Sequence, residues 1–111
     1  MKIQVFSKKT KGGLFVQFDI SSPREEEVDK LAVEPPGAMY EELMRMEEEM
    51  RASGEICASP DTGLQERIEP ISDSSYVIAG YYEMRDEPAS EAFIDRLRSI
   101  FPDGDFDVEY I

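Results

Sequence analysis

Apolar residues recur at two different periods along this chain of 111 residues, and the order of those periods constrains the fold more than any other feature. Leu14, Val16, Phe18 and Ile20 alternate with other residues, which is typical of a β-strand with one buried face. Between residues 38 and 53, apolar side chains instead recur every three or four positions, as on one side of an amphipathic helix. The chain is therefore expected to combine strands and helices.

The N-terminal part predicts a β-hairpin. Residues 2–8 alternate loosely and carry Ile3, Val5 and Phe6. The stretch Lys11-Gly12-Gly13 is a turn signal, because glycine adopts turn conformations at little steric cost. The strand at residues 14–20 follows directly, so two short strands are expected to pair through this turn.

Three helices are predicted. The first is short and begins at Ser22, which can form a capping box with Glu25. The second covers residues 38–53, and the third begins at Pro88 behind an acidic residue, Asp86 or Glu87. The apolar stripes expected in the core are Met39, Leu43, Met46 and Met50 on the second helix and Ala89, Phe93, Leu97 and Ile100 on the third.

The charged residues of the second helix are predicted to lie on its solvent side. Glu41 with Arg45 and Glu47 with Arg51 are four positions apart, a spacing that allows ion pairs on a helix surface. The acidic runs 25–27 and 47–49 are interpreted as solvated faces. Their alternative role is a docking surface for a basic partner.

Further strands are predicted between and after the helices. Residues 55–71 contain one or two extended pieces around a loop at 59–63, residues 75–85 form a strong strand, and residues 106–110 form the last strand. After the hairpin, the order is β-α-β-β-α-β. We therefore predict a single domain over residues 1–111 with an α+β, ferredoxin-like fold. It has an antiparallel sheet, helices on one face and an extra N-terminal hairpin strand.

The charge balance limits the classes of partner. The chain has 25 acidic and 12 basic residues, a net charge of −13, and no histidine. Such a surface repels nucleic acid and anionic membranes, whereas basic proteins and cationic ligands are attracted. Lys8, Lys9 and Lys11 reverse this charge at the hairpin tip, which is interpreted as a solvated turn or as a self-association contact onto an acidic neighbour.

Several kinds of chemistry are disfavoured by the residues present. Without histidine, Cys57 and the serines lack the usual activating base. The run Asp103–Glu109 begins like a calcium loop but lacks glycine at the sixth position, so no metal and no cofactor are expected. One cysteine, no apolar leader and no apolar run of about 20 residues favour a cytoplasmic protein outside the membrane.

The sheet face opposite the helices is the predicted ligand site or interface. Alternation is expected to direct Phe18, Ile20, Ile78, Tyr82, Met84, Phe106, Val108 and Tyr110 toward the helices. The candidate ligand or interface residues on the other face are Phe15, Gln17, Asp19, Tyr81, Glu83, Arg85 and Asp107, with Val77, Ala79 and Glu109 beside them. If the protein is an enzyme, Glu83 is the expected base, Arg85 orients an anionic group and Tyr81 donates a hydrogen bond.

The segment from residue 38 to 111 resembles the dimeric α+β barrel proteins, with the YCII-like and muconolactone-isomerase-like families nearest. Glu48-Glu49-Met50-Arg51-Ala52-Ser53-Gly54 resembles the end of their first helix, and Ile78-Ala79-Gly80-Tyr81-Tyr82-Glu83-Met84 resembles their central strand. Residues 87–101 resemble the second helix, and Asp107-Val108-Glu109 the closing strand. The resemblance implies a homodimer with a small-molecule cleft. The His–Asp pair of YCII-like proteins has no counterpart here, because histidine is absent.

These observations favour a non-catalytic binding protein of the dimeric α+β barrel type, with a small molecule as ligand. One alternative is an acidic interaction module that binds a basic protein, as inhibitors, immunity proteins and DNA mimics do. A second alternative is a histidine-free enzyme that uses a carboxylate in the cleft. High-salt adaptation would also explain the acidity without any partner.

Overall fold

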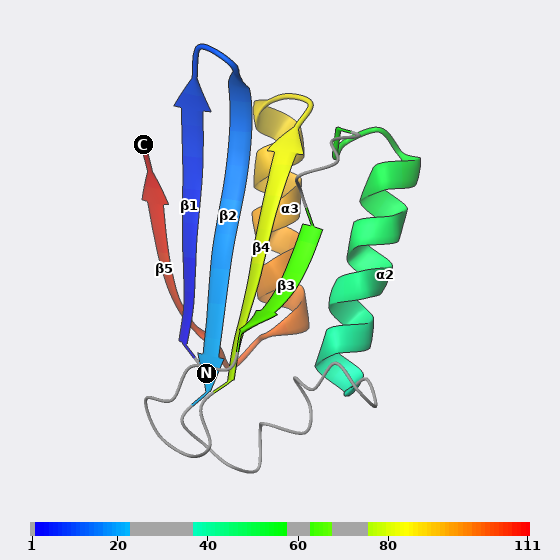
Figure 1. Ribbon diagram of the computed structural model, residues 1–111, viewed down its shortest axis with the longest axis vertical. Helices are drawn as coiled ribbons and strands as arrows, with labels where there is room; N and C mark the ends of the chain where they lie inside the picture. Colours follow the sequence, from blue (N-terminus) through cyan, green and yellow to red (C-terminus); the bar gives the residue numbers. More distant parts are fainter. Residues whose placement is uncertain (1, 23–36, 58–62, 68–75) are drawn as a thin grey trace.

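The computed structural model describes residues 2–22, 37–57, 63–67 and 76–111 (Figure 1). The helix predicted to begin at Ser22 lies outside these residues except for Ser22, which ends β2, and the loop predicted at 59–63 lies outside them except for Gly63, which begins β3. The described elements confirm an α+β fold. They are β1 (Lys2–Thr10), β2 (Gly13–Ser22), α2 (Ala38–Ala52), β3 (Gly63–Arg67), β4 (Tyr76–Met84), α3 (Glu87–Ile100) and β5 (Asp105–Tyr110).

The described strands form one mixed sheet in the order β3-β4-β2-β1-β5. β1 and β2 pair as the predicted antiparallel hairpin, with Val5 opposite Phe18. β5 pairs with β1 in parallel, so the expectation of a wholly antiparallel sheet is wrong. The reason is that β1 lies between β2 and β5. Since β1 runs opposite to β2, a closing strand that is antiparallel to β2 becomes parallel to β1.

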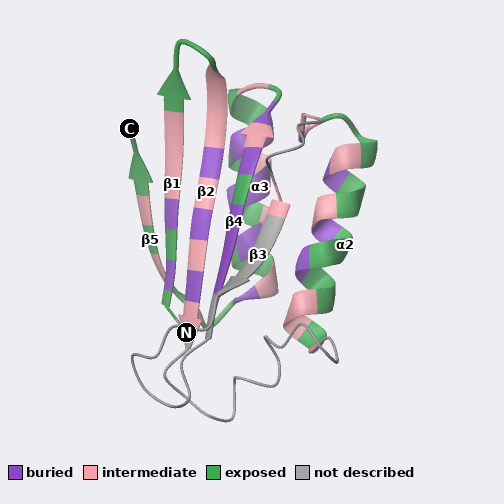
Figure 2. Ribbon diagram, in the orientation of Figure 1, coloured by how far each residue is buried: buried purple, intermediate pink, exposed green. Residues whose placement is uncertain are grey.

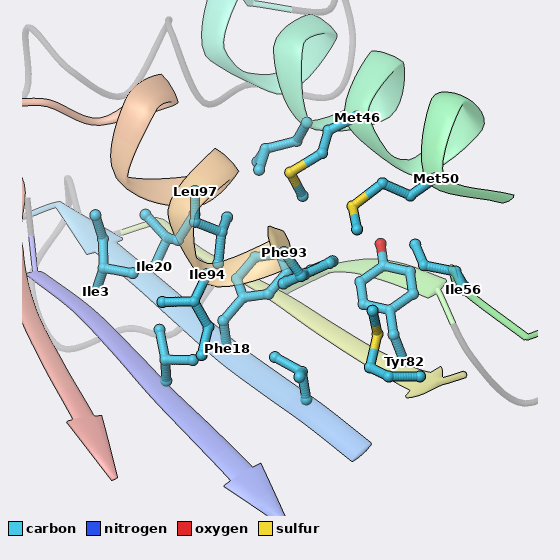
Figure 3. Close-up of a cluster of buried hydrophobic side chains, with 14 of the residues drawn as sticks. Ile3, Phe18, Ile20, Met46, Met50, Ile56, Tyr82, Phe93, Ile94 and Leu97 are labelled. Carbon is cyan, nitrogen blue, oxygen red and sulfur yellow. The ribbon is translucent and has the colours of Figure 1, made fainter. Parts of the chain in front are cut away.

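Both described helices pack on the same face of the sheet and enclose one hydrophobic core (Figure 3). Every second side chain of the strands points into the core, and these residues appear as buried bands along β2 in Figure 2. Phe18, Phe93 and Tyr82 lie at its centre, with ring centroids 5.2–6.3 Å apart. The other predicted core residues Ile20, Ile78, Met84, Leu43, Met46, Met50, Ala89 and Leu97 are buried, and Met39, Ile100, Phe106 and Val108 pack at its margin.

Gly80 on β4 makes this aromatic packing possible. A Cβ atom at Gly80 would lie 2.6 Å from Cζ of Phe18 and 2.9 Å from Cε2 of Tyr82, closer than real Cβ contacts. The missing side chain leaves room for the Phe18 ring to lie across β4. A glycine in a strand interior marks such a close approach.

The start of α3 is capped by the acidic residue that the sequence predicts. The Asp86 carboxylate accepts a hydrogen bond from the Ala89 N–H at 2.9 Å and caps α3, as expected from the Asp-Glu-Pro start. This bond, with the neighbouring Arg85, keeps the pKa of Asp86 below its ordinary value.

On α2, Arg45 pairs with Glu42 at 3.1 Å, three positions before it, and the predicted partner Glu41 is not the one it contacts.

Candidate functional site

The candidate site is the sheet face that the two described helices leave uncovered. On β2 it carries Phe15, Gln17 and Asp19, all partly exposed, whereas Val16, Phe18 and Ile20 between them are fully buried on the helix side. The same alternation holds on β1, where Ile3 and Val5 are buried. We call the uncovered surface the open face.

A stacked aromatic pair occupies the open face. The rings of Phe15 on β2 and Tyr81 on β4 lie 5.5 Å apart at an interplanar angle of 13°. Tyr81 is 38% exposed, and Ala79, two residues before it, is 9% exposed. On the neighbouring strand β1, Phe6 is partly exposed as well. The middle of the open face is therefore apolar and aromatic.

Polar groups border the aromatic pair. Lys8 reaches across the sheet, with its Nζ atom 3.4 Å from Oε1 of Gln17 and 5.8 Å from the centre of the Phe6 ring. Glu83 lies opposite Phe15 in the register of β2 and β4. Its carboxylate extends toward the hairpin turn, so that a Cβ at Gly13 would be 3.3 Å from its Oε1 atom. Hydrogen-bonding groups of both charges thus lie next to an aromatic surface.

Arg85 lies beyond the end of β4, and its place on the same face as Tyr81 and Glu83 stays a prediction. β4 ends at Met84, and the Arg85 N–H donates to the Glu55 carbonyl instead of continuing the ladder. Its guanidinium Nε lies 3.0 Å from Oδ2 of Asp86, at the start of α3. The structure therefore brings Tyr81 and Glu83 together, whereas Arg85 supports the loop that caps α3.

The end of the open face away from the hairpin turn is acidic. A hollow of about 350 Å³ lies there on β1, β2 and β5. In the register, Gln4 is flanked by Asp19 on one side and Asp107 on the other, and Lys2 by Ser21 and Asp105. Of the predicted residues, Asp19 and Asp107 therefore share this hollow, at some distance from Tyr81.

A second hollow of about 340 Å³ lies on the helix side, between the ends of β1 and β5 and the first turns of α3. Tyr110 lines it, on the side of the sheet that faces the helices as predicted, but its side chain stays 65% exposed and does not join the core. Desolvation and the nearby Glu91 carboxylate raise the pKa of the Tyr110 phenol. Lys9 and Glu87 form an exposed ion pair of 3.2 Å at the rim.

The sequence analysis missed a polar contact between α2 and the sheet. The buried hydroxyl of Tyr82 points toward α2 (Figure 3). It donates to Oε2 of Glu47 at 2.9 Å, and Arg51 Nε binds Oε1 of the same carboxylate at 3.1 Å. Burial, and then the Glu47 charge, raise the pKa of Tyr82 far above its ordinary value. Glu47 is thus partly buried, not part of a solvated run. The one sequence signal was a tyrosine on the core face of β4, whose hydroxyl needs a partner when buried.

Within the described parts of the chain, no group of three or more histidine, cysteine or acidic side chains is arranged to hold a metal ion. Cys57 is a free, partly exposed thiol whose backbone N–H donates to the Glu83 carbonyl at 2.8 Å. None of the described helices is both long and apolar enough to cross a membrane.

The chain matches no known family model, and no curated protein matches it either.

Proposed function

We propose that this protein is a non-catalytic binding protein of the dimeric α+β barrel type, in which two copies pair through their open faces and hold a small molecule between the sheets. The stacked and partly exposed pair Phe15 and Tyr81 on the uncovered sheet face is the observation that carries this proposal. Aromatic rings on an uncovered surface lose unfavourable contact with water when a partner covers them.

The strand arrangement supports the same class of fold. β4 lies between the two strands of the β2-α2-β3 unit, and β2 with β1 lies between the two strands of the β4-α3-β5 unit. Each β-α-β unit is thus split by the other, as in ferredoxin-like folds. Placing both helices on one side leaves the opposite side of the sheet for a second copy. In this proposal β1 is the extra strand and widens the open face.

The side chains around the aromatic pair favour a planar ligand that carries hydrogen-bond donors. Phe15 and Tyr81 offer ring surfaces for stacking. The carboxylate of Glu83 and the amide of Gln17 lie on either side of them in the register and accept hydrogen bonds. Such a combination of apolar walls and a few polar groups is typical of small-molecule sites.

The proposal is tested by measuring mass and dye binding together. In sedimentation equilibrium, we expect the wild type to dimerise and Tyr81→Asp to be monomeric, because an unpaired charge would be buried at the interface. Nile red, a neutral planar dye, should fluoresce with the dimer and lose most of this signal with Phe15→Ala. The matched control is Met44→Asp, on an exposed position of α2, which should change neither reading.

A monomeric wild type at all concentrations would contradict the proposal, and so would dye fluorescence that is unaffected by Phe15→Ala. A dimer that Tyr81→Asp leaves intact would place the interface elsewhere and contradict it equally.

A second candidate is the acidic interaction module, because Asp105, Asp107 and Glu109 are exposed at alternate positions of β5, an edge strand of the sheet. Long-range attraction would speed its encounter with a basic protein. Polylysine serves as the probe. This candidate requires salt-sensitive binding to a monomer, weakened by reversing Asp107 and Glu109 to lysine. Absence of binding at low ionic strength would exclude it.

A further inference from the structure

We infer that the two copies pair with their strands antiparallel, so that the lysine-bearing end of each open face lies over the acidic end of the other. This inference rests on the proposed pairing of open faces and adds its orientation. It follows from a separation of charge along the strands of a single face.

The lysine end adjoins the hairpin turn. It comprises Lys8, whose side chain lies on the open face beside Gln17, and Lys11, exposed in the turn beyond it. Glu83, opposite Phe15, and Glu109, exposed on β5 opposite Phe6, are the acidic side chains nearest to these lysines. Two ammonium groups are thus balanced by two carboxylates here.

The acidic end is the hollow at the opposite end of the same strands. It holds three carboxylates, from Asp19, Asp105 and Asp107, and one ammonium group, from Lys2. Neighbouring strands are about 4.8 Å apart, so Asp19 and Asp107, on the two strands that flank β1, are separated by roughly 10 Å. That leaves room for a lysine side chain between them, above Gln4.

Symmetry limits how two such faces can stack. A face-to-face dimer with a two-fold axis parallel to the strands would place each end over the same end of the partner. Lysines would then face lysines, and the acidic hollows would face each other, which is unfavourable in a desolvated interface. A two-fold axis across the strands places unlike ends together.

The spacing along β1 fits the second arrangement. Lys8 and Gln4 are four residues apart, about 13 Å along a strand, with Phe6 midway between them. An axis that passes over Phe6 sets Lys8 above the partner's Gln4 and between the partner's Asp19 and the partner's Asp107. The Phe6 rings of the two copies then meet at the centre, and the contact between unlike ends occurs twice.

The experiment reverses the charge of each end separately and then of both ends together. Lys8→Glu with Lys11→Glu should raise the dimer dissociation constant about tenfold or more at low salt, and so should Asp105→Lys with Asp107→Lys. The variant with all four substitutions should recover most of the wild-type affinity, because the introduced carboxylates of one end then lie over the introduced ammonium groups of the other. Sedimentation equilibrium at about 0.02 M and 0.5 M salt measures this, and the differences should shrink at high salt.

Lys9→Glu is the matched control, since Lys9 belongs to the same hairpin but pairs with Glu87 on the helix side. It should leave the dissociation constant within about twofold of wild type. Circular dichroism of each variant confirms that the fold is retained.

The outcomes separate this inference from the proposed function. A dimer that Tyr81→Asp abolishes but neither reversal weakens would overturn the antiparallel orientation and leave the pairing of open faces intact. A fourfold variant no tighter than the two partial reversals would overturn the orientation as well. A wild type that stays monomeric would contradict both proposals.

Discussion

The two faces of the sheet are formed by the same strands, yet the side chains on one face are buried and those on the other stay partly exposed. On β2, Val16, Phe18 and Ile20 face the helices and are fully buried, whereas Phe15 and Gln17 remain partly exposed on the open face. The buried hydroxyl of Tyr82 on the helix side has a partner, Glu47. The open face combines apolar rings with charged groups at its two ends. The helix side thus forms a packed core, whereas the open face keeps aromatic and charged side chains partly exposed.

The largest expected difference between the faces is in stability. Phe18→Ala should lower the free energy of unfolding by about 3–5 kcal/mol, because it leaves a cavity beside Phe93 and Tyr82. Phe15→Ala, three residues earlier on the same strand, should cost about 0.5–1.5 kcal/mol, since it removes a partly exposed stacking contact. Urea unfolding at low protein concentration, where dimers dissociate, measures both. Equal losses would mean that the open face is packed like a core.

The second prediction concerns the polar contact between β4 and α2. Tyr82→Phe should cost about 1–2 kcal/mol, because it removes a hydrogen bond to a charged carboxylate. Glu47→Ala should cost more, since it leaves the buried hydroxyl without its acceptor and also removes the ion pair with Arg51. A double-mutant cycle in urea gives their coupling. If the two losses simply add, Tyr82 and Glu47 do not act as a pair.

The third prediction uses the raised pKa of Tyr82. A phenol whose pKa is higher in the folded than in the unfolded state contributes stability that is complete below the unfolded pKa, about 10, and is lost as the pH rises above it. Unfolding free energies between about pH 8 and 11 should therefore fall more steeply for the wild type than for Tyr82→Phe. On unfolding at alkaline pH, tyrosinate absorbance should increase by one phenol more for the wild type than for Tyr82→Phe. Identical pH profiles for the two proteins would contradict the assignment.

The smallest effect is expected at the start of α3. Asp86→Ala removes the bond from the carboxylate to the Ala89 N–H and should destabilise the protein less than Tyr82→Phe does. Asp86→Asn is the control, because asparagine caps helices about as well as aspartate. Since the folded pKa of Asp86 is lowered, the difference between wild type and Asp86→Ala should diminish as the pH falls below about 4. A loss that is the same for both substitutions would show that the cap contributes through charge alone.

Much of the fold and part of the candidate site could be predicted from local patterns. The stripe on α2, the acidic cap of α3 and the alternation on β2 and β4 identified the buried residues, because period and capping are properties of neighbouring positions. The same alternation placed Phe15, Tyr81 and Glu83 on one face. Arg85 lies beyond the last paired residue of β4 and binds Asp86, a contact that the alternation along the strand did not predict.

The sequence by itself determined the class of each described element and the residues that share a face, since both depend on side chains two to four positions apart. Only the tertiary structure decided that β1 lies between β2 and β5, which makes one pairing parallel and sets the lysine and acidic ends along one surface. It also decided that Glu47 meets Tyr82, 35 residues away. Strand order and such contacts depend on how elements distant in sequence pack together, and no local period encodes that packing.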